Sequence, residues 1–248
     1  MIPIKSEEDI KKMSEGGKIS ALALVTVLKK LEVGSTLSDL DQIAEKAILE
    51  NGAKPSFKRV YNYKYATCIN INEGVVHGVP TQRKVKKGDL VKIDLGAFYK
   101  GFNTDLSYTI EVGTNRFAKF LAAGKEALKE AISNCIVDQK LGTVSNAIQR
   151  IIEKSGYSVS RELIGHGVGK KLHEAPEIPG YGVAGTGVSM KEGMVFALEV
   201  IYQVGRPEIA YEKDGWTIIT KDRSLAGLFE HTVAITAMGP KVLTDFSL

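Results

Sequence analysis

The first fifty residues alternate polar and apolar positions in the way of two amphipathic helices. Ser6, with Asp9 three residues later, has the form of a capping box, and the helical pattern continues to Leu31. A second helix is predicted to start near Ser38, which has Asp41 three residues later. Its apolar residues share one 3.6-residue face and stop before Gly52: Leu40, Ile43, Ala44, Ala47 and Ile48.

Extended segments follow this helix pair. Over residues 66–77, Ile69 and Ile71 alternate with Asn70 and Asn72, which indicates a strand. The remaining elements are predicted in chain order as a hairpin over 89–111 that turns near Tyr99-Lys100-Gly101, helices over 115–136 and 143–155, and strands near 194–204, 214–220 and 228–237.

One pattern occurs twice. Gly88 and Gly193 each stand at a turn, and each is followed by an apolar strand that carries a carboxylate six residues on, Asp94 in the first case and Glu199 in the second. A helix pair accompanies each copy. The sequence therefore predicts an α+β fold in one domain, 1–248, built from two similar halves of roughly 1–113 and 114–248.

Composition narrows the class of protein. With 248 residues, 44% hydrophobic and 25% charged, the chain is an ordinary globular protein, and a net charge of +4 is too weak to indicate nucleic acid binding. Two cysteines do not make a disulfide framework, so a reducing cytoplasm is expected. The first residues lack the apolar core of a signal peptide, and we expect no membrane span.

Asp94 and Asp105 flank the predicted hairpin turn. A two- or four-residue loop there would put both on one face of the sheet, directly opposite or one diagonal step apart, with Cβ atoms roughly 5–8 Å from each other. Two like charges so placed repel, and a metal cation is the usual compensation. The alternative is that one carboxylate is an exposed strand residue.

The segment from Gly165 to Pro176 holds two of the four histidines, His166 and His173. Glycines on both sides of His166 let the backbone approach a neighbour closely, and they argue against a helix. The alternative is a glycine-rich loop with buried histidines. His77 is predicted at a strand end, whereas His231 follows Glu230 in a strand and must point to the opposite face.

Together these residues resemble the type I methionine aminopeptidases, metallopeptidases of the pita-bread fold. The resemblance spans about residues 5–240. The chain lacks the insertion that marks the type II enzymes. It implies an antiparallel α+β fold of two pseudo-symmetric halves, with two pairs of covering helices. The positions that match the metal ligands of the family are Asp94, Asp105, His166, Glu199 and Glu230, and its two other site histidines match His77 and His173.

The resemblance also implies the reaction. Two divalent ions, Co, Mn, Fe or Zn, would hold a hydroxide that attacks the first peptide carbonyl and so removes N-terminal methionine, preferably before a small second residue. Asp94 would serve one metal, His166 and Glu199 the other, and Asp105 and Glu230 both. His77, His173 and Glu199 would be catalytic, through hydrogen bonds to substrate and proton transfer.

By the same resemblance, substrate would contact His77 and His173, and the methionine pocket would be lined by Tyr63, Cys68, Leu172 and Trp216. Leu172 and Val200 depart from the family pattern and bear on the shape of that pocket. The resemblance implies that methionine peptides and nascent chains are the partners of this protein. It also implies a monomer in the cytoplasm that associates at most transiently with ribosomes.

Three alternatives stay open. The chain could be a prolidase or an aminopeptidase P, although those usually carry an additional N-terminal domain. It could be a binding protein on the same fold that has lost catalysis, although all five ligand positions are present. The basic run Arg83-Lys84-Val85-Lys86-Lys87 suggests RNA binding, but it has no interleaved aromatic residues and is more typical of a solvated turn.

Overall fold

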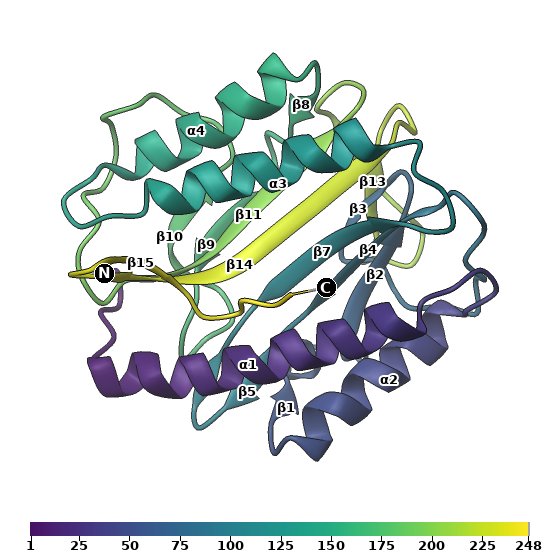
Figure 1. Ribbon diagram of the computed structural model, residues 1–248, viewed down its shortest axis with the longest axis horizontal. Helices are drawn as coiled ribbons and strands as arrows, with labels where there is room; N and C mark the ends of the chain where they lie inside the picture. The colour runs from purple at the N-terminus through teal and green to yellow at the C-terminus, as the bar shows by residue number, and fades with distance from the viewer. Residues whose placement is uncertain (248) are drawn as a thin grey trace.

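In a computed structural model that describes residues 1–247, four α-helices form two pairs, as predicted. The pairs lie along one side of a large sheet, with α1 and α2 below α3 and α4 in the view of Figure 1. The capping box of Ser6 and Asp9 is present at the start of the first helix. The helices are α1 (Glu7–Lys30), α2 (Leu37–Glu50), α3 (Ala118–Ser133) and α4 (Leu141–Lys154), with a 3₁₀ helix, η1, at Phe57–Arg59.

Helix α2 begins at Leu37, within one residue of the predicted start near Ser38, but its cap is not the predicted one. Thr36, not Ser38, caps the helix, because its hydroxyl accepts a hydrogen bond of 3.1 Å from the Asp39 amide. Asp41 does not belong to a capping box. Its carboxylate is buried and accepts hydrogen bonds from the amide and the hydroxyl of Thr67, so that it ties the helix to the sheet.

The strands of the described residues form one large antiparallel sheet and two small ones. The main path of the large sheet is, in order, β10 (Glu174–Pro179), β9 (Ile164–Gly167), β11 (Val195–Gln203), β14 (Ala226–Thr236), β7 (Leu106–Glu111), β4 (Leu90–Leu95) and β2 (Thr67–Ile71), with β15 (Gly239–Val242) on β14 and β8 (Ser158–Val159) on β11. The small sheets are β1 (Lys54–Pro55), β5 (Ala97–Tyr99) and β6 (Phe102–Asn103), and β12 (Ile209–Tyr211), β13 (Ile218–Thr220) and β3 (Gly74–Val76).

The predicted hairpin over 89–111 is confirmed. Strands β4 and β7 pair along their length, and β5 and β6 extend the same register to a two-residue turn at Lys100 and Gly101. Both turn residues have positive φ, 47° and 90°, which is the conformation of a type I′ turn. The twist of such a turn matches that of the strands, so the register set at the tip continues into the centre of the sheet.

Two other strand predictions hold only in part. The segment 66–77 is interrupted after β2 by a turn at Asn72, whose φ is 52°, and β3 joins a different sheet. Asn70 is buried rather than solvent-facing. In the segment 214–220, only Ile218–Thr220 is a strand, because the residues before it form a turn in which Asp214 accepts hydrogen bonds from Trp216 and Thr217.

The large sheet has an apolar face and a charged face. On β11, Phe196, Leu198 and Val200 belong to the core beneath α3 and α4, and on β4, Val91 and Ile93 belong to the core beneath α1 and α2. Each such buried side chain contributes roughly 1.5–3 kcal/mol. The alternate residues of these strands point to the other face, where the candidate site lies.

None of the helices in residues 1–247 is both long enough and apolar enough to span a bilayer.

Candidate metal centre

A row of polar residues crosses the middle of the charged face. Asp94 on β4 lies opposite Ser107 on β7, and Ser107 lies opposite Glu230 on β14. Glu230 in turn lies opposite Glu199 on β11. Neighbouring strands are about 4.8 Å apart, so register alone brings three carboxylates and Ser107, one residue from each of four strands, into one line.

Asp105 joins this row from the end of the hairpin. It stands two residues before Ser107, the partner of Asp94, so the two aspartates are one diagonal step apart, which is one of the two predicted arrangements. Thr232 of β14 holds the backbone of Asp105 on both sides, because its hydroxyl accepts from the Asp105 amide and donates to the Asp105 carbonyl, each at 2.8 Å.

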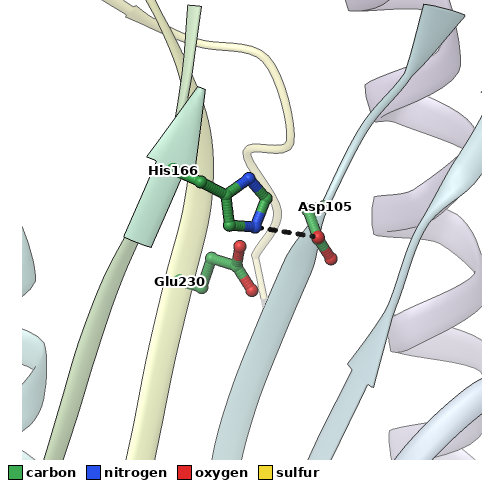
Figure 2. A group of neighbouring side chains, drawn as sticks. All are labelled: Asp105, His166 and Glu230. Carbon is green, nitrogen blue, oxygen red and sulfur yellow. Dashed lines mark ion pairs between the residues drawn. The ribbon is translucent and has the colours of Figure 1, made fainter. Parts of the chain in front are cut away.

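His166 enters the row from β9. Its Nε2 lies 3.6 Å from Glu199 Oε1 and 3.9 Å from Asp105 Oδ2, the contact dashed in Figure 2. Its Nδ1–H donates to the Gly167 carbonyl at 2.9 Å, which leaves Nε2 free to bind a metal. One ligand atom from each of Asp105, His166 and Glu230 lies within 4.8 Å of the others, so the three point at a common space, as Figure 2 shows.

The glycines beside His166 have the predicted role. A Cβ at Gly165 would lie 2.7 Å from the Ala197 carbonyl, and one at Gly167 would lie 2.2 Å from the Ala175 carbonyl. Neither neighbour is a movable side chain, so any larger residue would push β9 away from β11 or β10. The short distance from His166 to Glu199 depends on this close strand packing.

The carboxylates of the row lie in an environment that disfavours their charge. Burial raises the pKa of Asp94, Glu199 and Glu230 well above the usual range, and it raises that of Asp105 to about 7. The neighbouring carboxylates act in the same direction on Asp94, Glu199 and Glu230. Among residues 1–247, no group hydrogen-bonds to the buried Asp94 Oδ1 or Glu230 Oε1.

These groups fit a divalent cation. Buried, mutually repelling carboxylates with free oxygens are stabilised by positive charge, and carboxylates with one imidazole suit a hard or borderline metal. Burial, with the neighbouring His173, lowers the pKa of His166 to about 4, so the imidazole is neutral near pH 7, as a ligand must be.

A cavity of about 110 Å³ opens onto this row. Its lining includes every site residue expected from the sequence: Asp94, Asp105, His166, Glu199, Glu230, His77, His173, Tyr63, Cys68, Leu172 and Trp216. Three apolar residues that the sequence did not single out line it as well: Phe57, Val60 and Val76. They lie in η1, directly after it, and at the end of β3, elements too short to leave a periodic signal.

Aromatic rings form one wall of this cavity. The rings of Tyr63 and Trp216 meet edge to face, with centroids 4.9 Å apart, and the Tyr63 hydroxyl donates to the Thr67 carbonyl at 2.8 Å. Tyr63 and Cys68 are both buried. This wall and the carboxylate row together give the cavity an apolar end and a charged end.

Two further histidines stand at the cavity. His77 follows β3 with a φ of 57°, a left-handed conformation that few non-glycine residues adopt and that often marks a functional position. The ring of His173 meets that of His166 with centroids 4.5 Å apart. His77 and His173 are exposed residues, but desolvation by the surrounding chain lowers the pKa of both, so each ring is mostly neutral near pH 7 and then carries one N–H donor.

His231 lies on the opposite face of the sheet, as its position next to Glu230 predicts. Its Nδ1 is 3.1 Å from the Thr244 hydroxyl, and its ring packs near Phe246. It does not line the cavity of the carboxylate row among the residues described.

Comparisons with known proteins agree with this geometry. Residues 11–237 match the profile of metallopeptidase family M24. A methionine aminopeptidase of Clostridium perfringens is 39% identical over 246 residues, which is 98% of this chain and 99% of the relative. The crystal structure of a Thermotoga maritima methionine aminopeptidase superposes with a TM-score of 0.96 at 41% identity, covering 99% of this chain and 100% of that one. A prolidase from Pyrococcus furiosus superposes with a TM-score of 0.80 at 28% identity, but the match covers only 66% of that chain.

Proposed function

The chain belongs to metallopeptidase family M24, and from this premise we propose how its site residues carry out the reaction. It is a metal-dependent hydrolase that removes the N-terminal methionine of peptides, the activity for which its full-length relatives are named. The observation that carries the assignment is the carboxylate row with His166 at the charged end of a cavity whose other end is aromatic and apolar.

The metal would be held by the five residues of the row. Asp94, Asp105, Glu199 and Glu230 supply four negative charges and His166 a neutral nitrogen, so two divalent cations, Co, Mn, Fe or Zn, would balance the charge. Asp105 and Glu230 would serve both ions. Such ions supply Lewis acidity, which makes water nucleophilic near neutral pH.

The histidines at the cavity act on the substrate. His173, neutral and with an N–H to donate, binds the oxygen of the scissile carbonyl as negative charge develops there. His77 holds the substrate amide and assists proton transfer, and its left-handed backbone fixes its direction. Glu199, at the edge of the row beside His166, carries a proton to the departing amine.

The aromatic end of the cavity receives the methionine side chain. Tyr63, Cys68, Leu172 and Trp216 offer the aromatic and sulfur surfaces with which a thioether makes favourable contacts. Phe57 extends the same wall, since it packs in one cluster with Tyr63 and Cys68. Leucine at 172 leaves more space than an aromatic residue would, so this pocket is expected to be wider than one with phenylalanine there.

The proposal includes a cellular setting. We expect a cytoplasmic monomer that processes nascent chains and peptides with a small second residue and that associates at most transiently with ribosomes. We also propose that the single domain, 1–248, consists of two halves that meet near residue 113, because one helix pair lies before that point and the other after it.

A peptide series tests the proposal. Protein stripped with a chelator and reloaded separately with Mn²⁺, Co²⁺, Fe²⁺ or Zn²⁺ should release methionine from Met-Ala-Ser and Met-Gly-Ser, and release little from Met-Leu-Ser. Ala-Pro-Ser serves as the probe for a prolidase-like or aminopeptidase P-like activity. His231→Asn, on the far face, is the matched control for His77→Asn and His173→Asn, which should lower turnover and spare metal binding. Metal-loaded protein that cleaves Ala-Pro-Ser and leaves Met-Ala-Ser intact would refute the assignment.

A further inference from the structure

The loop between His166 and His173 determines where His173 lies. Beyond β9 the chain runs through residues 168–173 without helix or strand before β10 begins at Glu174. Within residues 1–247, nothing hydrogen-bonds to the ring of His173, which contacts the ring of His166 at a centroid distance of 4.5 Å. The direction of the ring therefore depends on the backbone of its loop.

Asn103 holds the apex of this loop. Its backbone N–H donates to the Gly169 carbonyl at 2.7 Å. Its side-chain Nδ2 donates to the same carbonyl at 3.0 Å and to the Lys170 carbonyl at 3.1 Å. Asn103 is only 2% exposed, so these bonds are shielded from competing water.

Asn103 also belongs to the strand that delivers a carboxylate of the row. It ends β6 and stands two residues before Asp105, whose backbone is in turn fixed to β14 by Thr232. One short piece of extended chain thus joins the carboxylates of the site to the loop that carries His173. The two segments are distant in the sequence, since Asn103 and Gly169 are 66 residues apart.

A second contact holds the far end of the loop without touching the carboxylate row. Lys5 Nζ lies 2.7 Å from Glu174 Oε2, with both side chains buried, and the Lys171 amide donates to Glu174 Oε1 at 3.0 Å. This ion pair anchors the start of β10 to the N-terminal arm. Of the two contacts that hold the loop, only the one made by Asn103 comes from the segment that carries Asp105.

We propose that Asn103 is a positioning residue for catalysis, setting the distance between His173 and the metal-binding carboxylates through its hydrogen bonds to the loop. The inference rests on the proposed role of His173 at the scissile carbonyl. A side chain that aligns a transition-state donor changes the rate of the chemical step more than it changes substrate or metal binding. Outer residues that orient a reacting group typically account for about 10- to 100-fold in activity.

The test uses two variants. Asn103→Ala removes both side-chain hydrogen bonds, and Asn103→Asp keeps the size and the backbone bond but replaces the donor by an acceptor that faces two carbonyls. Each should lower kcat about 10-fold or more, with KM for Met-Ala-Ser and the calorimetric Kd for Mn²⁺ within about twofold of wild type. Asn146→Ala is the matched control, since it removes a comparable 3.0 Å bond from a side chain to the Gly182 carbonyl elsewhere in the fold.

Two readouts separate positioning from a merely structural role. In metal-free protein, amide hydrogen exchange over residues 168–173 should speed up in both Asn103 variants and not in Asn146→Ala. In a His173→Ala background, Asn103→Ala should have no further effect on kcat, because its action passes through that ring.

The outcomes distinguish the two proposals. If His173→Ala itself leaves kcat unchanged, the proposed role of His173 fails. If His173→Ala lowers kcat and Asn103→Ala lowers it again by the same factor as in wild type, the inference about Asn103 is wrong. Unchanged exchange in the loop of the Asn103→Asp variant would overturn it too, independently of turnover.

Discussion

The two faces of β14 show how one strand serves stability and chemistry at once. Phe229 points to the helix side, where it packs edge to face against Tyr108 at 5.2 Å and is 1% exposed. Glu230, the next residue, is 2% exposed on the other side, and no residue of the described chain bonds its Oε1. The two side chains are almost equally buried. Phe229 packs against apolar neighbours, whereas Glu230 has a carboxylate oxygen without a hydrogen-bond partner among the described residues.

Stability is given up for function on the face of β14 that carries Glu230. An apolar ring in a packed core gains from burial, whereas a buried carboxylate among others of its kind opposes folding until a cation is present. Burial raises the pKa of Glu230 for this reason. A substitution on the helix side of β14 should therefore lower stability and spare activity. A substitution on the carboxylate side should lower activity and spare the stability of the metal-free protein.

The largest effect is expected for Glu230→Gln. The amide keeps the shape of the side chain but removes a charge from the row, so turnover should fall about 1,000-fold or more, as for other groups at a reacting centre. In the presence of a chelator its unfolding free energy should equal or exceed that of wild type, because a disfavoured buried charge is gone. Steady-state kinetics with urea unfolding checks both, and a large loss of metal-free stability would contradict the comparison.

Phe229→Ala should show the reverse signature. Loss of the buried ring leaves a cavity beneath α3 and should lower the unfolding free energy by about 3–5 kcal/mol. The metal-loaded protein that remains folded at 20 °C should keep its kcat and its Kd for Mn²⁺ within about threefold. Thermal unfolding with activity measured on the same samples provides the check, and a kcat reduced as much as in Glu230→Gln would show that the two faces are not separable.

The smallest effect concerns His231, which shares the helix face with Phe229. Burial lowers its pKa to about 4 in the folded protein, so the unfolded chain binds more protons between that value and about 6.5. This residue therefore supports stability above pH 6.5, and its contribution is lost as pH falls toward 4. Urea unfolding of metal-free protein at pH 7 and pH 4.5 should show a drop that is smaller in His231→Asn, by on the order of 2 kcal/mol. An identical drop in both proteins would mean that the ring is already protonated in the fold.

Part of this site could be predicted from local chain geometry, whereas the roles of Glu199, Glu230, His77 and His173 came from the resemblance to the family. The two-residue turn at Lys100 and Gly101 sets the register that puts Asp94 and Asp105 one diagonal step apart. The glycines beside His166 indicate a close backbone contact. Successive side chains of a strand point to opposite faces, which puts Glu230 and His231 on different sides of the sheet. The helix pairs were predictable from their periodic apolar faces.

What could not be predicted depends on contacts between distant segments. The pairing of Ser107 with Glu230 joins strands that are more than a hundred residues apart, and no local pattern specifies it. The same holds for Thr232 at Asp105 and for Asn103 at Gly169. Thr36 and Ser38 are both good helix caps, and the choice between them is made by the loop at Arg83, whose carbonyl accepts from the Leu37 amide.

The place of β14 in the sheet has a consequence for synthesis. This strand lies between β11 and β7 at the centre of the large sheet, yet it is made almost last, at Ala226–Thr236. A chain emerging from the ribosome can pair β4 with β7 early, but the other edge of β7 then stays open until β14 arrives. During that interval the growing chain exposes a strand edge to its neighbours. A chain that stops before β14 contains Asp94, Asp105, His166 and Glu199 but lacks Glu230, which lies between them in the row.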